Sequence, residues 1–309
     1  MAVSTNYLLN QILRISKFFL LGTAIVFSVA CTKTEITEVH EPYLIDGNDP
    51  PDYSGVTTLQ VQNYVSRLYI DLLGEQPPVE VLQEKVDFLQ DNELSVESRE
   101  TLITELMEDE EYTVNIFNYT SVQFLNGVSR AELQDQIDLY AYAIQLYYDQ
   151  GEIQLAQVIE LEMFKLQLLV EADVEFQTGN ISINEFYRRF CYNTIYDEIN
   201  MGSENMVIAC FENLFGRYPT NNELIAGVSM VDGLSVVILQ ETGNSKADFV
   251  EIVTHTEEFY LGRVYEQYQR LLTRQPIPIE EQEGAELLES EGFQAFQKSI
   301  LISDEYAAF

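Results

Sequence analysis

Carboxylates are the commonest side chains in this sequence that could do chemistry. Asp and Glu account for 51 of the 309 residues, and adjacent pairs occur at Glu110 with Glu111 and at Glu257 with Glu258. A glycoside hydrolase uses one carboxyl group as an acid in an apolar pocket and a second, about 5 to 10 Å away, as base or nucleophile. Adjacent helix positions point in different directions, however, and so acidic a composition creates such pairs by chance. We therefore assign no catalytic residue, and a carboxylate-dependent hydrolase of cell-envelope glycans stays the alternative to a non-enzymatic function.

Other catalytic and metal chemistries have less support. The only histidines are His40 and His255, and no Gly-x-Ser-x-Gly occurs, which disfavours serine–histidine catalysis. Residues 46–49 (Asp-Gly-Asn-Asp) suggest calcium, but the glycine and the distal Glu of an EF-hand are misplaced. Without a Cys-x-x-Cys, zinc ribbons, thioredoxin chemistry and covalent haem attachment have no basis. We predict no metal site and no cofactor.

The N-terminus has the pattern of a secretory signal. Residues 1–30 contain two cations and no acid, and include an apolar run at 18–27 that is followed by Ser-Val-Ala at 28–30. This apolar stretch is too short to span a membrane comfortably. We predict that residues 1–30 are a signal peptide and exclude them from the fold.

Cys31 directly follows this segment, in a position that resembles the lipobox of bacterial lipoproteins. Ser28 stands where most lipoboxes have leucine, as in the looser boxes of Bacteroidota-type lipoproteins. The resemblance implies that Cys31 is lipidated and that acyl chains attach the protein to a membrane. We expect it in the cell envelope, lipid-anchored at the outer membrane on the periplasmic or surface face. The alternative is an ordinary signal peptide followed by a chance cysteine.

The charge of the chain excludes one class of partner. The formal charge is −35, with only 16 Lys and Arg, and removing residues 1–30 with their two cations leaves −37. Nucleic-acid affinity comes mainly from Lys and Arg, so we expect no nucleic-acid partner. The acidic, proline-containing residues 31–58 have no helical periodicity and are predicted to form a tether. The hydrophobic content of 46% is that of a folded chain.

Three similar turns show that the chain contains a repeat. They lie at residues 72–77, 214–219 and 271–276, and each ends in a proline. Before each aligned proline, a valine lies twelve positions and an aromatic residue eight positions upstream: Val65 and Tyr69, Val207 and Phe211, Val264 and Tyr268. A spacing of four places both side chains on one helical face. Related tetrads, each with an acid before a final aromatic residue, close the copies at 109–112, 256–259 and 303–306.

Each copy is predicted to be a helix, a sharp turn and a second helix that folds back. Gly216 can end a helix in a left-handed conformation, Pro219 stops it, and Thr220 with Glu223 forms a capping box for the next helix. We expect the two arginines of the turns to pair with nearby carboxylates in a structural role. We assign a structural role in the turns to nine residues of the repeat: Gly74, Pro77, Gly216, Arg217, Pro219, Thr220, Glu223, Arg274 and Pro276.

Between the first two copies, the sequence predicts an antiparallel helical hairpin. Ser129 caps the first helix, residues 149–151 (Asp-Gln-Gly) break it, and a second apolar helix follows. Residues 233–239 are the only plausible strand in the sequence, but they are few and flanked by turns, so we expect an irregular connection or a short helix. The predicted fold is therefore all-α, with tandem helix-turn-helix repeats and an inserted helical hairpin. The predicted segments are 1–30 signal peptide, 31–58 tether, 59–120 first repeat, 121–200 hairpin and connecting helix, and 201–309 second and third repeats.

The repeat resembles two helical families. Residues 180–190 followed by 214–220 (Leu-Phe-Gly-Arg-Tyr-Pro-Thr) are similar to the phycobilisome linker domain, and to a small helical repeat of unknown function found in tandem in secreted bacterial proteins. Residues 180–309 have most of the likeness, and 61–112 are a weaker copy with Glu75 in place of the arginine. The resemblance implies an all-helical fold and a role in holding other components together, and it transfers no catalytic residue. Pigment assembly is not expected of a lipidated, acidic chain.

Two further cysteines, Cys191 and Cys210, either form a disulfide in an oxidising compartment or remain buried small apolar side chains. The anchor, the tether, the tandem helical units and 19 tyrosines together favour a non-catalytic scaffold or binding module. We expect an envelope protein or a glycan as its partner, in addition to the membrane.

Overall fold

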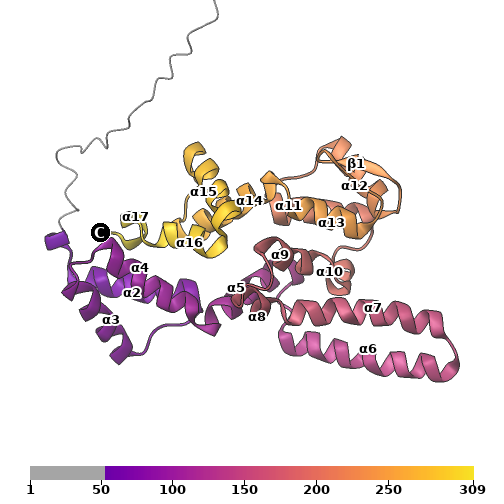
Figure 1. Ribbon diagram of the computed structural model, residues 1–309, viewed down its shortest axis with the longest axis horizontal. Coiled ribbons are helices and arrows are strands. Elements are labelled where there is room, and N and C mark those ends of the chain that lie inside the picture. Colours follow the sequence, from indigo (N-terminus) through magenta and orange to yellow (C-terminus); the bar gives the residue numbers. More distant parts are fainter. Residues whose placement is uncertain (1–52) are drawn as a thin grey trace, which may run out of the picture. The chain divides into compact units, whose positions relative to one another are not determined.

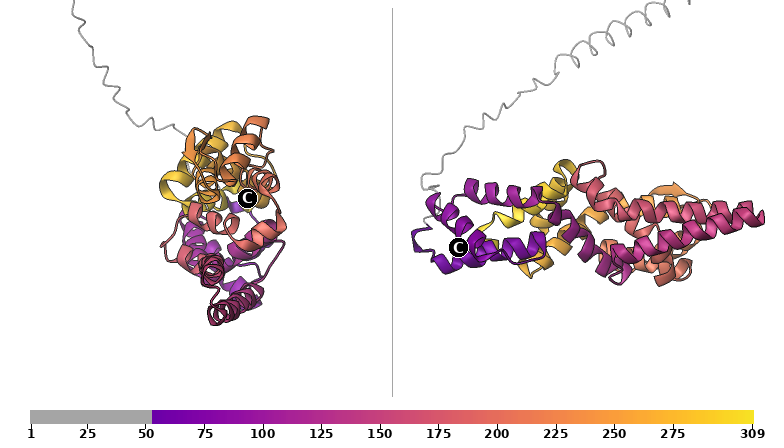
Figure 2. Two further views of the ribbon diagram at one scale, coloured as in Figure 1. Left: turned by 90° about the vertical axis from the view of Figure 1, so that its right-hand side faces the viewer. Right: turned by 90° about the horizontal axis from the view of Figure 1, so that it is seen from below.

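The computed structural model describes residues 53–309, all of which belong to one compact unit, residues 52–309. The predicted signal peptide, Cys31 and nearly all of the tether lie outside the described residues. Sixteen α-helices and two short strands make up the described part (Figures 1 and 2), which confirms the all-α prediction. Within residues 53–309, no helix combines the length and apolarity that crossing a membrane requires.

The first repeat begins after a short 3₁₀ turn, η1 (Tyr53–Gly55). Its helices are α2 (Thr58–Leu73), α3 (Val79–Asp91), α4 (Val96–Glu108) and α5 (Glu110–Leu125). Thr57 caps α2 in a capping box with Gln60, and Gly74 ends it with a left-handed φ of 79°. The boundary expected after residue 120 falls inside α5, which continues past it.

The predicted hairpin is present, as α6 (Arg130–Gln150) and α7 (Ile153–Val170), which pack along each other. Ser129 makes the expected capping box with Glu132, and Gly151 ends α6 with a φ of 78°. Both figures show the far end of the hairpin extending away from the other helices of the unit. Three shorter helices follow: α8 (Ala172–Gln177), α9 (Ile183–Cys191) and α10 (Thr194–Ile199).

The second and third repeats share a helix. Their elements are α11 (Ser203–Phe215), α12 (Asn221–Val231), β1 (Val236–Ile238), β2 (Glu241–Gly243), α13 (Lys246–Thr254), α14 (Glu257–Gln267), the π-helical turn η2 (Tyr268–Leu272), α15 (Pro278–Glu291), α16 (Phe293–Leu301) and α17 (Asp304–Ala307). The last helix of the second copy, α14, is also the first helix of the third copy, because η2 continues it directly into the third turn.

The connection expected at residues 233–239 to be irregular or a short helix instead enters a β-hairpin. Val236 pairs with Gly243 and Ile238 with Glu241 in antiparallel register. Leu239 and Gln240 both have positive φ, 50° and 70°, which is the backbone of a tight hairpin turn. The expectation failed because neither residue is one of the usual turn formers.

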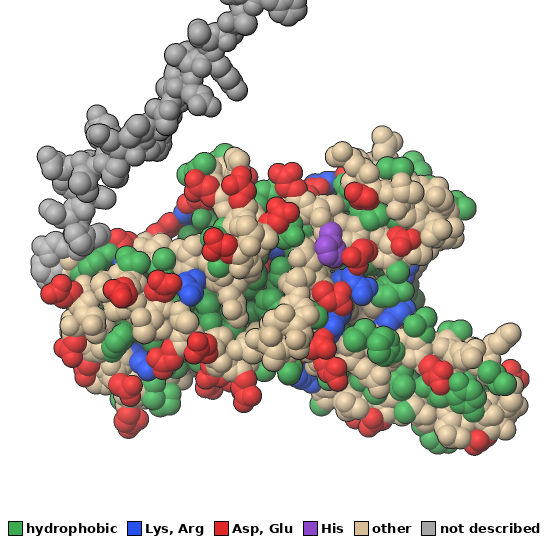
Figure 3. Space-filling view, viewed as in Figure 1, with side chains coloured by type: hydrophobic (Ala, Val, Ile, Leu, Met, Phe, Trp, Pro, Cys, Tyr) green, Lys and Arg blue, Asp and Glu red, His purple; other side chains and the backbone are tan. Residues whose placement is uncertain are grey.

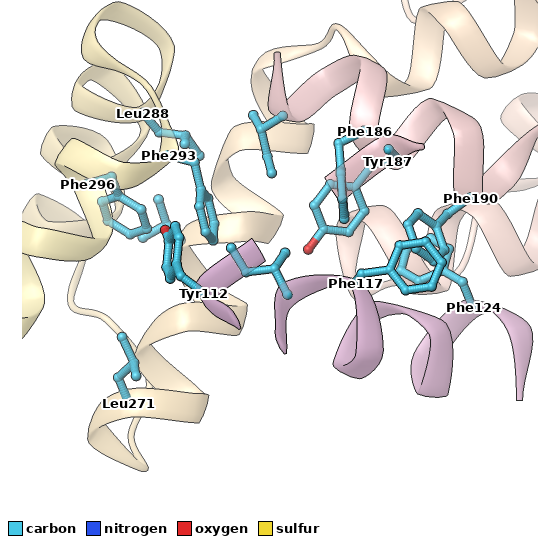
Figure 4. Packing of buried hydrophobic residues seen from close by; sticks show 14 of the residues in the cluster. Tyr112, Phe117, Phe124, Phe186, Tyr187, Phe190, Leu271, Leu288, Phe293 and Phe296 are labelled. Atoms are coloured by element: carbon cyan, nitrogen blue, oxygen red, sulfur yellow. The ribbon is translucent and has the colours of Figure 1, made fainter. Parts of the chain in front are cut away.

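The core is a continuous set of aromatic and aliphatic side chains along α5 (Figure 4). At one end, Phe117 of α5 packs against Phe190 of α9 with ring centroids 5.1 Å apart. At the other end, Tyr112 lies near Phe293 and Phe296 of the third repeat. The helix α5 therefore joins the first repeat to the later ones, and all three repeats contribute to a single core.

Candidate functional site

The second turn contains a group of ion pairs around Arg217, which we call a clamp. The guanidinium donates from Nη1 and Nη2 to the two carboxylate oxygens of Glu223, at 2.9 and 2.8 Å, and from Nη2 to Glu258 at 2.7 Å. Glu223 also accepts the backbone N–H of Thr220 at 2.6 Å, in the capping box that starts α12. Hydrogen bonds from Arg217 are the main reason that the pKa of Glu223 falls to about 2.

The third turn repeats this clamp around Arg274. Its guanidinium binds both oxygens of Glu280 at 2.7 Å, and those of Glu305 at 2.6 and 2.7 Å. These hydrogen bonds also lower the pKa of Glu280 and of Glu305. In both clamps, one glutamate lies six residues after the arginine and the other begins a later helix, so each clamp ties a turn to the end of its own copy.

The pairing of both arginines with carboxylates agrees with the sequence analysis, which did not identify the distant partners. Glu258 and Glu305 occupy the same place in the closing tetrads, and this shared position was the signal that could have found them. Glu258, one of the acids considered for a hydrolase, is held in the Arg217 clamp. Glu110 and Glu111 are exposed in the first turn of α5.

The first turn has no such clamp. Glu75 replaces the arginine, and the residue six positions later is Val81. Asn115 of α5 instead donates to the carbonyl oxygens of Asp71 and Leu72, at 3.2 and 3.0 Å. A neutral amide thus caps the end of α2, so the first copy is held without an ion pair at this position.

Cys191 and Cys210 are both buried and are free thiols in this structure. Burial raises the pKa of the Cys191 thiol well above its ordinary value, and a hydrogen bond with Cys210 raises it further. The two side chains are therefore neighbours, and a disulfide between them stays a prediction. In residues 53–309, no group of three or more His, Cys, Asp or Glu residues is arranged to hold a metal ion.

The hairpin of α6 and α7 exposes many large apolar side chains. We give the name hairpin surface to six of these side chains: Leu139, Tyr142, Leu146, Val158, Leu161 and Phe164. All six are exposed, Tyr142 to 68% and Phe164 to 53%, and Figure 3 shows hydrophobic side chains along this part of the molecule. Spacings of three and four place them in one strip on each helix. Neither strip contributes to the core.

A small pocket of about 150 Å³ lies at the base of the hairpin, between α7 and α9. Phe164 and Leu168 line it from α7, and Tyr192 follows α9. The Lys165 ammonium lies 4.2 Å from the centre of the Tyr192 ring and also binds Glu162 at 2.8 Å. The pocket has room for about one large apolar side chain, next to cations that are already paired.

A second, more polar pocket of about 430 Å³ lies where α5, α11, α14 and η2 meet. The residues that line it include Gln123, Asn213, Gln269, Arg263 and Arg270. The sequence analysis identified none of these residues, because they come from four elements that only tertiary packing brings together. We call this site the junction pocket.

Comparison of the chain with protein-family models, curated proteins and solved structures found no match. The similarity of the repeat to linker and secreted helical domains therefore stays a prediction from the turn motif.

Proposed function

We propose that this protein is a membrane-anchored lipoprotein of the cell envelope that acts as a non-catalytic scaffold or binding module for a protein or glycan partner. The observation that supports the binding role is the hairpin surface. Its two strips of large apolar side chains face water rather than the core. Uncovered apolar area of this kind is typical of partner-binding surfaces.

A protein partner fits the hairpin surface better than a glycan does. Leu161 and Phe164 offer few hydrogen-bonding groups to sugar hydroxyls, whereas covering their exposed area gains about 25 cal/mol per Å². Two antiparallel helices with outward apolar strips also match the way that amphipathic helices pack against one another.

Site-specific photo-crosslinking tests this role. A photoreactive residue in place of Phe164, in the lipidated chain in intact cells, should crosslink to one envelope protein. The same residue in place of Val79, which is 78% exposed on α3, serves as the matched control and should not. Crosslinks only to the chain itself, or the same product from both positions, would contradict the proposed binding surface.

A pair of substitutions tests the same surface by affinity. Phe164→Glu should abolish co-purification of the crosslinked protein from detergent-solubilised membranes, because a charge would be buried in an apolar contact. Val79→Glu should leave it intact. Equal recovery with both variants would show that the partner binds elsewhere.

A further inference from the structure

Arg270 is distinguished from every other cation in the described residues by having no carboxylate partner. Residues 53–309 contain thirteen Lys and Arg, and twelve of them have a carboxylate oxygen within 4.0 Å. Acids outnumber cations by 51 to 16 in the whole chain, so an unpaired arginine is unexpected. Its one described hydrogen bond runs from Nη2 to the carbonyl oxygen of Asp71, at the end of α2.

The backbone at Arg270 is also unusual. Arg270 lies in η2, the only π-helical segment of the described chain, and π-helical insertions often occur at functional sites. The equivalent positions in the other two turns, six residues before the aligned proline, are Asp71 and Asn213, and both lie in ordinary α-helix. The arginine and the π-helical turn are therefore specific to the third copy, so the repeat alone does not explain them.

Arg270 lines the junction pocket beside a second arginine whose charge is already engaged. Arg263 is only 2% exposed, and it pairs with Glu266 and donates to the carbonyl oxygens of Asn213 and Leu214 at 2.7 and 3.2 Å. Arg270 has no such set of acceptors. Its guanidinium lies 4.2 Å from the centre of the Tyr119 ring. This cation–π contact uses no N–H group, so the guanidinium keeps N–H donors for a ligand.

Two buried polar groups near Arg270 lack regular hydrogen bonds within the described part of the chain. They are the Tyr119 hydroxyl and the amide nitrogen of Gln267, which lie next to each other. Burial is the main cause that raises the pKa of Tyr119 to about 12, so its hydroxyl stays protonated and neutral. These two groups are polar and uncharged, so they do not neutralise Arg270.

We propose that the junction pocket binds the carboxylate of a small sugar acid, with Arg270 as the group that recognises it. A guanidinium fork matches a carboxylate with two parallel hydrogen bonds. The amide side chains of Gln123 and Gln269 can bond sugar hydroxyls, and Tyr265, which is 41% exposed at the rim, offers a ring face.

The remaining charges of the pocket define the ligand further. Glu212 and Glu266 also line it, so they would repel a ligand with several negative charges, such as a phosphate ester. A singly charged carboxylate on an otherwise neutral, hydroxylated ring pairs with Arg270 and meets less of that repulsion than a multiply charged ligand does. This site is separate from the hairpin surface, so the proposed sugar-acid binding does not depend on the proposed protein partner.

Calorimetric titration of the full chain in detergent tests the proposal with three kinds of probe: sugar acids, their methyl esters and a glutamyl dipeptide. Galacturonate and glucuronate should bind saturably, and the corresponding methyl ester, which keeps the hydroxylated ring but has no charge, should bind roughly tenfold or more weakly. Equal binding of acid and ester, or no saturable binding of either acid, would overturn the proposal. Tighter binding of a glutamyl dipeptide than of both sugar acids would overturn the assignment to a sugar.

Variants locate the binding in the pocket. Arg270→Gln keeps a donor for the Asp71 carbonyl but removes the charge, and should weaken binding of the sugar acid roughly tenfold or more. Arg188→Gln, at the base of the hairpin, is the matched control and should bind as the unmodified chain does. Phe164→Glu should also bind normally, which separates this site from the hairpin surface. An unchanged affinity in Arg270→Gln would rule out Arg270, and the acid–ester comparison on the unmodified chain holds even if that variant fails to fold.

Discussion

At the scale of single residues, the two arginine clamps explain why the turns repeat. Arg217 and Arg274 each bind one glutamate of the following capping box and one at the start of a later helix. Each arginine therefore links its own turn to the N-terminus of a later helix. The pairs are partly exposed, with 34% of the Arg217 side chain and 31% of the Glu258 side chain accessible, so solvent screening reduces what each contributes.

Substitution of Arg217 by Gln should lower the free energy of unfolding by about 1 to 2 kcal/mol, because charge-assisted hydrogen bonds to two carboxylates are lost and partly replaced by water. Urea denaturation followed by circular dichroism measures this. Lys298→Gln, which removes a longer surface pair with Glu100 at 3.7 Å, should change stability by less than about 0.5 kcal/mol. Equal effects of the two substitutions would contradict a special role for the clamp.

The clamps also predict how stability depends on pH. The pKa of Glu223 is about 2 in the folded chain against an ordinary value of 4.5. A carboxyl with a depressed pKa contributes stability that is fully present above its unfolded pKa and is lost as pH falls toward the folded value. Stability should therefore decline between about pH 5 and pH 2, and Arg217→Gln should decline less over that range. Parallel pH profiles of the two proteins would argue against the clamp as the cause.

At the scale of elements, close backbone contact determines where α11 and α14 cross. Gly262 of α14 lies against the backbone of Leu214, near the end of α11, and a methyl group at Gly262 would collide with the Leu214 carbonyl oxygen. The same carbonyl accepts a hydrogen bond from Arg263. Glycine is required here by space, since the obstructing atom belongs to rigid backbone.

Gly262→Ala should consequently destabilise the protein by about 3 kcal/mol, near the upper end for overpacking a core contact. Gly151→Ala, in the turn of the hairpin, meets no atom within 4 Å and has only its φ of 78° against it, so its cost should stay near 1 kcal/mol. Thermal unfolding of the two variants side by side provides the measurement. A smaller loss for Gly262→Ala than for Gly151→Ala would show that α11 and α14 can move apart.

At the scale of the whole molecule, the acidic composition belongs largely to helix caps and the solvated surface. Asp and Glu occupy the first turns of most described helices, where the helix dipole favours them. The high negative charge is thus compatible with a stable fold and provides solubility. It does not by itself indicate a cationic ligand.

The proposed lipid anchor at Cys31 can be tested by substitution in the chain that carries the predicted signal peptide. Cys31→Ser should shift the protein from the membrane to the soluble fraction of lysed cells, because acyl chains are the predicted means of attachment. Fractionation followed by immunoblotting measures the shift, with Cys191→Ser as the matched control that should stay at the membrane. A Cys31→Ser protein that remains membrane-bound would contradict lipidation at this residue.

Much of the fold could be predicted from local signals. The cap of α6 at Ser129, its left-handed end at Gly151 and the capping box of Thr220 with Glu223 all lie within a few residues of the helix that they delimit. Short-range hydrogen bonds decide such features, so they can be read from residue types and spacing. The hairpin turn at Leu239 and Gln240 was missed because its residue types are unusual for that backbone.

The sequence by itself determined the helical class, the inserted hairpin and the three turns, since each depends on neighbours along the chain. Tertiary structure alone decided which distant residues meet. Arg217 reaches Glu258, 41 positions away, and the Tyr306 hydroxyl of the last helix donates to Asp71 of the first long helix at 2.8 Å. The junction pocket arises in the same way, from four elements around Arg270. Contacts of this kind depend on how whole helices pack, and packing sums many weak, non-directional interactions that no local pattern of residues encodes.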